Sequence, residues 1–288
     1  MLRLKDPNSH QDWQNVPRES THWLAHAPNP LQPWTLETPQ TLDAWILKNP
    51  KQDFSRFLVY YGINGTSLST DTNIERDLER AISSQDSAQL KDELTFLLEG
   101  ESVRDVQAWV ELNHERLSLM FPHFKSQYFQ FLYPRPFRSD VVNATREFNA
   151  SEALVYAIMR EASGFDTNFR SLEKTIGLIP IQHDLAQSLL RSMNMGDGIE
   201  PTDLTYPAVN IQIGTYYFHY LTKILTDVPS VIAAHKAGQS DVMRWKKIAG
   251  VSSNDWETFI ELIPQTETQL YVKRVLASYW MYRRLYNL

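Results

Sequence analysis

The stretch that decides the fold is AIMREASGFD, residues 157–166, at the end of an apolar segment that begins at Ser151. Ser151, followed by Glu152 and Leu154, is typical of a capped helix start. The sequence therefore predicts a helix from Ser151 to Ser163. Helical periodicity continues on both sides of it.

The chain after this helix is predicted to be helical as well. Glycine is scarce, with 10 among 288 residues, and the 15 prolines fall mostly between periodic segments. No alternating segment of useful length predicts a strand. The sequence therefore predicts an all-α fold. The expected helices around the central one are Arg138–Phe148, Gln182–Met193, Val209–Thr226, Ser230–Ala237 and Gln269–Tyr286.

The N-terminal side divides into two parts. Residues 1–40 are polar and carry six prolines, which predicts an extended arm or linker. Short amphipathic helices over 41–132, among them Ala88–Leu98, resemble a superhelical array. Tyr133-Pro-Arg-Pro-Phe137 is the expected boundary, because two prolines in three residues end the helix that precedes them. The third predicted unit is 133–288.

Composition excludes several classes of function. The net charge of −6 excludes a generally basic nucleic-acid binder, and the absence of cysteine excludes disulfides and thiolate chemistry. The eight histidines show no metal-ligand spacing, and no phosphate- or dinucleotide-binding motif occurs, so no metal or cofactor is expected. No apolar run reaches the ~18 residues of a membrane span. Residues 1–30 lack a signal segment, so the chain either is made for the cytoplasm or has lost a leader.

Six segments in the C-terminal half resemble, in order and spacing, the soluble lytic transglycosylases of glycoside hydrolase family 23. The family pattern for the central helix is A-[LI]-[MI]-R-[QE]-E-S-x-F-[DN]. The resemblance covers roughly residues 133–286. It implies a lysozyme-like domain behind a helical segment, peptidoglycan as ligand and a periplasmic location. The matching segments are 133–137, 157–166, 177–178, 210–214, 234–238 and 263–274.

The resemblance fails at the position that does the chemistry. In the family one glutamate protonates the glycosidic oxygen and then takes a proton from the muramoyl 6-hydroxyl, which requires a carboxyl with a raised pKa. That position is Ala162, which has no proton to exchange. Glu161 is a weak substitute, because it lies ~100° around the helix and is expected to face elsewhere.

Other expected substrate-binding positions are also altered. Ser171, Gly177, Glu267 and Tyr271 match the family. The exchanged positions are Pro180 for a glutamine, Gln182 for a methionine, His235 for a tyrosine and Lys236 for an asparagine. These exchanges trade apolar, sugar-facing surface for polar and cationic groups. We therefore expect weak, salt-sensitive glycan binding carried mostly by charge.

The sequence thus predicts a catalytically inactive relative, a pseudoenzyme that binds peptidoglycan or holds an envelope protein. The alternative is a genuine lytic transglycosylase, cleaving MurNAc–GlcNAc to 1,6-anhydroMurNAc, in which the glutamate at 162 has been replaced by alanine. Two further alternatives are an enzyme that uses Glu161 or another acid, and a structural subunit without glycan affinity. A natural glutamate codon at 162 would support the enzyme.

Overall fold

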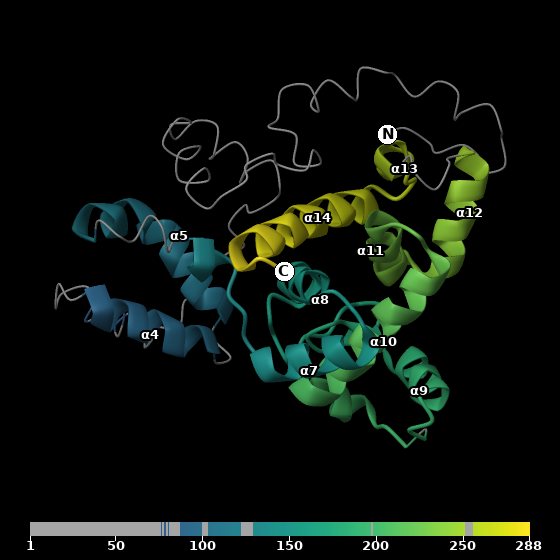
Figure 1. Cartoon of the computed structure of the whole chain (residues 1–288), viewed down its shortest axis with the longest axis horizontal. Helices are drawn as coiled ribbons and strands as arrows, with labels where there is room; N and C mark the ends of the chain where they lie inside the picture. The colour runs from purple at the N-terminus through teal and green to yellow at the C-terminus, as the bar shows by residue number, and fades with distance from the viewer. Residues whose placement is uncertain are drawn as a thin grey trace.

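The computed structural model describes residues 76, 78, 80, 87–99, 103–121, 129–196, 198–250 and 256–288. The predicted arm over 1–40 and the helices expected between 41 and 75 lie outside these residues. The described part is all-α apart from one small hairpin, which confirms the predicted fold class (Figure 1). The division at 133 stays a prediction.

Fourteen named elements make up the described part. They are α4 (Ser87–Glu99), α5 (Val103–Met120), α7 (Arg138–Phe148), α8 (Glu152–Ile158), the π-helix η3 (Met159–Ser163), β1 (Thr175–Ile176), β2 (Ile181–Gln182), α9 (His183–Ser192), the 3-10 helix η4 (Pro201–Thr205), α10 (Pro207–Ile224), α11 (Val228–Ala237), α12 (Gln239–Ala249), α13 (Trp256–Glu261) and α14 (Thr266–Tyr286).

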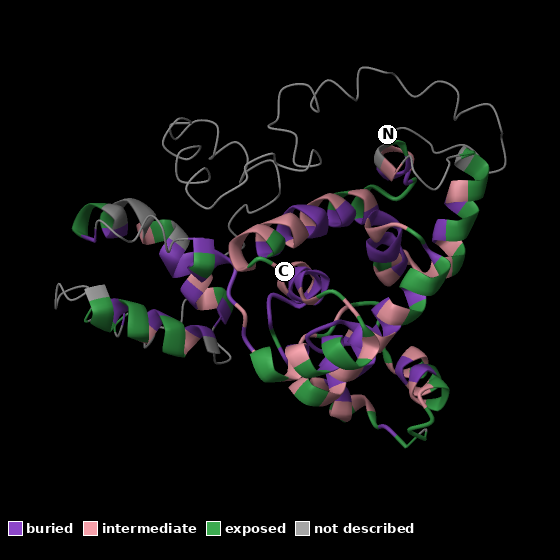
Figure 2. Cartoon of the chain, viewed as in Figure 1, coloured by how far each residue is buried: buried purple, intermediate pink, exposed green. Residues whose placement is uncertain are grey.

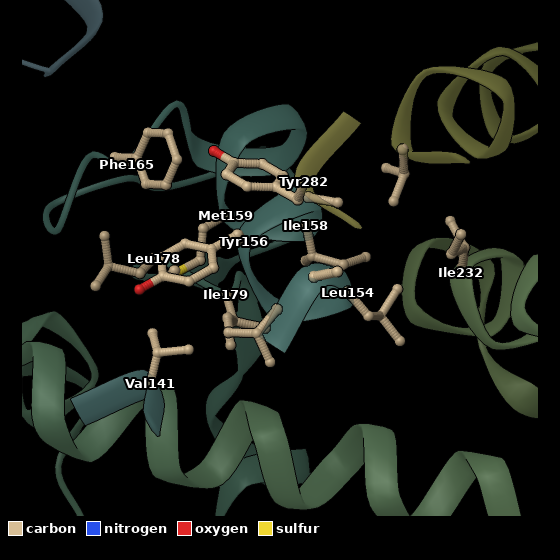
Figure 3. Close-up of a cluster of buried hydrophobic side chains, with 14 of the residues drawn as sticks. Val141, Leu154, Tyr156, Ile158, Met159, Phe165, Leu178, Ile179, Ile232 and Tyr282 are labelled. Carbon is tan, nitrogen blue, oxygen red and sulfur yellow. The ribbon is translucent and has the colours of Figure 1, made fainter. Parts of the chain in front are cut away.

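Helix α8 is the centre of the C-terminal unit. Its residues 153–158 are all buried, as expected for a helix that is apolar on every side. It packs between α14 and α7, and α7 packs in turn on α10 (Figure 1). Figure 3 shows Tyr156 and Ile158 of α8 surrounded by side chains from the neighbouring elements. The predicted cap is also present, since Ser151 Oγ accepts a hydrogen bond from the Leu154 amide.

The central helix changes its winding in the last turn. Residues 159–163 form the π-helix η3, and Gly164 ends it with a left-handed φ of 62°. π-helical turns occur frequently at functional sites, because the extra residue redirects the side chains around it. Position 162 lies within this turn.

The start and the end of this unit are joined. Tyr282 Oη donates to the Pro134 carbonyl at 2.8 Å, and Tyr286 Oη donates to the Tyr133 carbonyl at 2.7 Å. The Arg135 guanidinium lies 3.8 Å from the centre of the Tyr286 ring, at cation–π distance. The two prolines thus end the preceding helix, and the last turns of α14 hold the resulting segment.

Helices α4 and α5 pack on each other beside this unit (Figure 1). Gln107 of α5 donates to the Leu132 carbonyl at 2.7 Å, and Arg160 donates to the same carbonyl at 3.1 Å. The two helices carry both buried and exposed residues (Figure 2). Among the described helices none is long and apolar enough to cross a bilayer.

Candidate functional site

Position 162 lies half-buried on η3, where its side chain is a methyl group. A methyl group neither donates nor accepts a proton or a hydrogen bond. A group that gives or takes a proton near this position has to belong to another residue.

The Glu161 carboxylate contacts Arg160, Arg274 and Ser278. It forms an ion pair with Arg160 and accepts a hydrogen bond from Ser278 Oγ of α14 at 2.5 Å. Arg274 Nε lies 3.7 Å from its second oxygen, and the side chain is 11% exposed. Glu161 therefore points toward α14, away from the direction of residue 162, as the helical spacing predicts.

Arg160 completes this buried charge network. Its side chain is 10% exposed, and its guanidinium lies 4.4 Å from the centre of the Tyr133 ring. Burial acts to lower the pKa of Arg160, but the Glu161 carboxylate together with Tyr133 and Tyr282 outweighs it, so the pKa is raised. Glu161 is thus the counter-ion of a buried arginine, a structural role.

The turn between β1 and β2 faces the end of η3. Gly177 has a φ of +92°, and a Cβ there would lie 2.3 Å from both Asn210 Nδ2 and the Leu204 carbonyl oxygen. Only glycine fits this position. Ser163 Oγ lies 2.7 Å from the Leu178 carbonyl and 2.9 Å from the Met159 carbonyl, and so ties the turn to η3.

Asn210 of α10 holds the same turn from the other side. Its Oδ1 accepts from the Ile179 amide at 2.7 Å, and its Nδ2 donates to the Ile176 and Ile179 carbonyls at 3.2 and 3.3 Å. Asn210 is 1% exposed. The motif residues Gly177 and Asn210 are therefore scaffolding, and both contribute to the position of Pro180.

His235 of α11 lies between this turn and α14. Its Nδ1 is 3.2 Å from Tyr271 Oη, and its ring stacks on that of Tyr271 with centroids 6.2 Å apart. Its Nε2 is buried and makes no hydrogen bond of normal geometry within the described residues. The structure thus brings together two predicted site residues, His235 and Tyr271, and places the Pro180 carbonyl near the imidazole.

This burial sets the charge of His235. Desolvation, and secondarily the positive charge of Lys236, lower the pKa of His235 to about 4, against a small opposing effect of the Pro180 carbonyl. Burial also raises the pKa of Tyr271, helped by Glu161 and opposed by Arg274. Near pH 7 the phenol therefore keeps its proton, and its hydroxyl and Nδ1 are joined by a hydrogen bond. His235 therefore adds no positive charge to the exchanged positions near pH 7, because desolvation disfavours the imidazolium.

The exposed predicted residues form an ion pair and a hydrogen bond within the chain. Lys236 Nζ forms an ion pair with Glu267 at 2.8 Å, with side chains 30% and 74% exposed. Gln182 Nε2 donates to the Glu173 carbonyl at 3.1 Å. With the lysine paired and the imidazole neutral, these positions carry less positive charge than the sequence led us to expect.

The Ser171 side chain bonds to the backbone of the loop that follows it. Its Oγ accepts hydrogen bonds from the Glu173 amide at 3.1 Å and the Thr175 amide at 3.2 Å. The hydroxyl of Thr175 lies 2.8 Å away. Ser171 therefore organises the loop before β1, rather than standing beside His235 and Tyr271.

Ser278 belongs to this site but was not predicted from the sequence. Tyr271, Arg274 and Ser278 follow one another at i, i+3 and i+7 on α14, a spacing that places them on one helix face. That spacing was the available signal. Within the described part of the chain, no three His, Asp or Glu side chains gather as metal ligands.

The fold and this cluster define a lysozyme-like all-α domain whose central helix continues into the π-helical turn that contains position 162. The transglycosylase SLT domain matches residues 141–258. Residues 141–258 therefore carry a transglycosylase SLT domain, and the chain is similar to the soluble lytic transglycosylases.

Curated relatives support this assignment. The soluble lytic murein transglycosylase of Salmonella typhimurium is 30% identical over 154 residues, which cover 52% of this chain and 23% of that protein. The membrane-bound lytic murein transglycosylase C of Shigella sonnei is 27% identical and covers 50% of this chain and 45% of the relative. The chain thus spans only part of these relatives.

Solved structures share the fold. The crystal structure of the 70 kDa soluble lytic transglycosylase from Escherichia coli matches with a TM-score of 0.55 at 19% identity, covering 94% of this chain and 47% of that one. An inactive mutant of the lytic transglycosylase Slt from Pseudomonas aeruginosa matches with a TM-score of 0.53 at 20% identity, covering 85% and 41%.

Proposed function

We propose that this protein is a catalytically inactive lytic transglycosylase relative that binds peptidoglycan in the cell envelope. The observation that carries the proposal is Ala162 together with the engagement of its neighbour: both oxygens of Glu161 face cations or a hydroxyl. A carboxylate held as the partner of a buried arginine is a poor general acid, because giving it a proton breaks the ion pair.

The second candidate is an active enzyme that lost its glutamate by substitution. The intact scaffold favours it, since Gly177, Ser163 and Asn210 hold the turn against η3. Pro180 and His235 argue against an active enzyme. Proline has no amide N–H, and the buried neutral imidazole stands at the family's tyrosine position.

The test is product release from murein sacculi. We expect no 1,6-anhydromuropeptides above a protein-free blank at any pH between 4 and 8, with an active soluble lytic transglycosylase as positive control. Ala162→Glu alone should remain inactive, whereas Ala162→Glu with Pro180→Gln and His235→Tyr should show the higher activity of the two. Anhydro products from the unaltered chain would refute the inactive assignment. Strong turnover from the single substitution would favour the second candidate.

Binding is measured separately from chemistry. Pull-down on sacculi at about 50 mM and about 500 mM salt separates charge-carried from uncharged binding, because exposed charges are largely screened at the higher value. Given the Lys236–Glu267 pair and the neutral His235, we expect weak binding with a modest salt effect. No binding at either salt would favour an envelope protein as partner. We also propose 133–288 as the glycan-binding unit and 41–132 as an accessory helical unit.

A further inference from the structure

Helix α10 has a second face that the candidate site does not use. Asn210 and Phe218 point from it toward the site, where the Phe218 ring lies 5.5 Å from that of His235. Tyr220 is two residues beyond Phe218, about 200° around the helix. Residues 216, 219, 220 and 223 therefore form one stripe on the opposite side of α10.

Three aromatic rings meet on this stripe. Phe148, at the end of α7, lies edge-on to Tyr216 with centroids 5.3 Å apart, and the His219 ring follows Tyr216 at 6.1 Å, only 33° from parallel. Phe148, Tyr216 and His219 are half-buried, and Tyr220 is 40% exposed. We call these four residues the α10 aromatic patch.

The chemistry of this patch differs from that of the exposed apolar residues on α4 and α5. There, Phe96, Leu112 and Leu119 are 73%, 71% and 86% exposed and carry no polar atoms. In the α10 aromatic patch, by contrast, hydroxyl and imidazole groups accompany the ring faces. A pyranose has the matching character, with an apolar C–H face and a rim of hydroxyl and amide groups.

The charge beside the patch fits the same class of ligand. Lys223 is exposed, one turn beyond His219 on the same stripe, and has no carboxylate within ion-pair distance in the described part of the chain. A free ammonium beside aromatic rings attracts a sugar that bears a carboxylate, such as a lactyl-substituted hexosamine.

We infer that the α10 aromatic patch is an accessory binding site for a β-1,4-linked N-acetylhexosamine strand, with its sugar rings lying on Tyr216, His219 and Tyr220. It lies on the side of α10 away from position 162, so one protein can contact a glycan at two places. The inference deepens the proposed function and rests on it for the choice of sugar.

The test is a titration of the full chain with chitotetraose, observed by NMR on methyl-labelled Ile224 and Ala162. Ile224 follows Tyr220 by one helical turn, and Ala162 reports on the candidate site. We expect saturable shifts at Ile224. A shift at Ala162 alone would overturn the inference and leave the proposed function standing, whereas a shift at Ile224 alone would support the inference and count against the candidate site. No shift at either methyl would count against both.

Variants separate direct contact from indirect effects. His219→Ala with Tyr220→Ala should weaken the response at Ile224 by about tenfold, since each lost aromatic contact contributes about 0.5–1.5 kcal/mol. Tyr206→Ala removes another exposed tyrosine, 61% exposed at the opposite end of α10, and should leave the response unchanged. Equal affinities for the double variant and the unaltered chain would overturn the inference. So would shifts at Ile224 that follow protein concentration without sugar, which would identify a second copy as the occupant.

Discussion

The buried imidazole of His235 makes a quantitative prediction about stability. In the unfolded chain this histidine should take up a proton near its ordinary pKa of 6.5, whereas in the folded protein burial lowers the pKa to about 4. Between these values the unfolded state binds more protons than the folded state. The free energy of unfolding therefore falls as the pH drops from 6.5 toward 4, and His235 has little effect above 6.5.

The size of the effect follows from the two pKa values. For 6.5 and about 4, His235 alone should remove about 2 kcal/mol of stability between pH 7 and pH 5. Urea unfolding, followed by tryptophan fluorescence at both pH values, measures this difference. Carboxylates also titrate over this range, so the comparison is made with His235→Asn, whose side-chain oxygen can still accept a hydrogen bond from Tyr271.

Comparison with His235→Asn removes the contribution of the carboxylates to the pH dependence of stability. Packing losses in His235→Asn affect both pH values alike, so its loss of stability from pH 7 to 5 should be smaller than that of the unaltered protein by about 2 kcal/mol. Tyr271→Phe is the control, because it removes the hydrogen bond to Nδ1 but keeps the imidazole buried, and it should retain most of the pH dependence. If His235→Asn and the unaltered protein lose the same stability, the imidazole is not held neutral by burial.

Three further substitutions test the scaffold around the site. Gly177→Ala should destabilise the protein by about 2–4 kcal/mol, because its Cβ would meet Asn210 and the Leu204 carbonyl; Gly196→Ala, at a φ of +83° with nothing within 4 Å, should cost only about 1 kcal/mol, and equal losses of urea midpoint would contradict the crowding argument. Asn210→Ala should cost about 3 kcal/mol from three lost hydrogen bonds, seen as faster amide exchange at Ile179, and unchanged exchange would contradict it. Glu161→Gln should cost about 3 kcal/mol in thermal or urea unfolding by leaving Arg160 without its counter-ion, and an unchanged stability would restore Glu161 as a candidate acid.

Local signals predicted the helices well. The predicted bounds Arg138–Phe148 are those of α7, and Ser151–Ser163 corresponds to α8 continued by η3. Each is bounded by capping or proline signals that act over a few residues. The β1–β2 hairpin was missed, because two residues a strand are too few to show alternation. Helix α12 was also missed, since among its residues 239–248 Val242 and Trp245 alone are buried.

The site could be predicted only where helical geometry decides it. The direction of Glu161 follows from its place one residue before Ala162. The neutrality of His235 does not, because it depends on contact with Tyr271, 36 residues away, and on the Pro180 carbonyl. The pairing of Lys236 with Glu267 likewise joins two helices that the sequence alone does not place side by side. Charge at a site is a tertiary property.

The bonds from Tyr282 and Tyr286 to the 133–134 segment have a topological consequence. Because Tyr282 and Tyr286 contact residues 134 and 133, the first and last segments of residues 133–286 lie side by side. Polypeptide attached before Tyr133 and polypeptide attached after Tyr286 would leave from the same point. If residues 133–288 form a separate unit, as the sequence predicts, we expect chain joined at either end, or a permutation that links the ends, to leave α8 and position 162 in place.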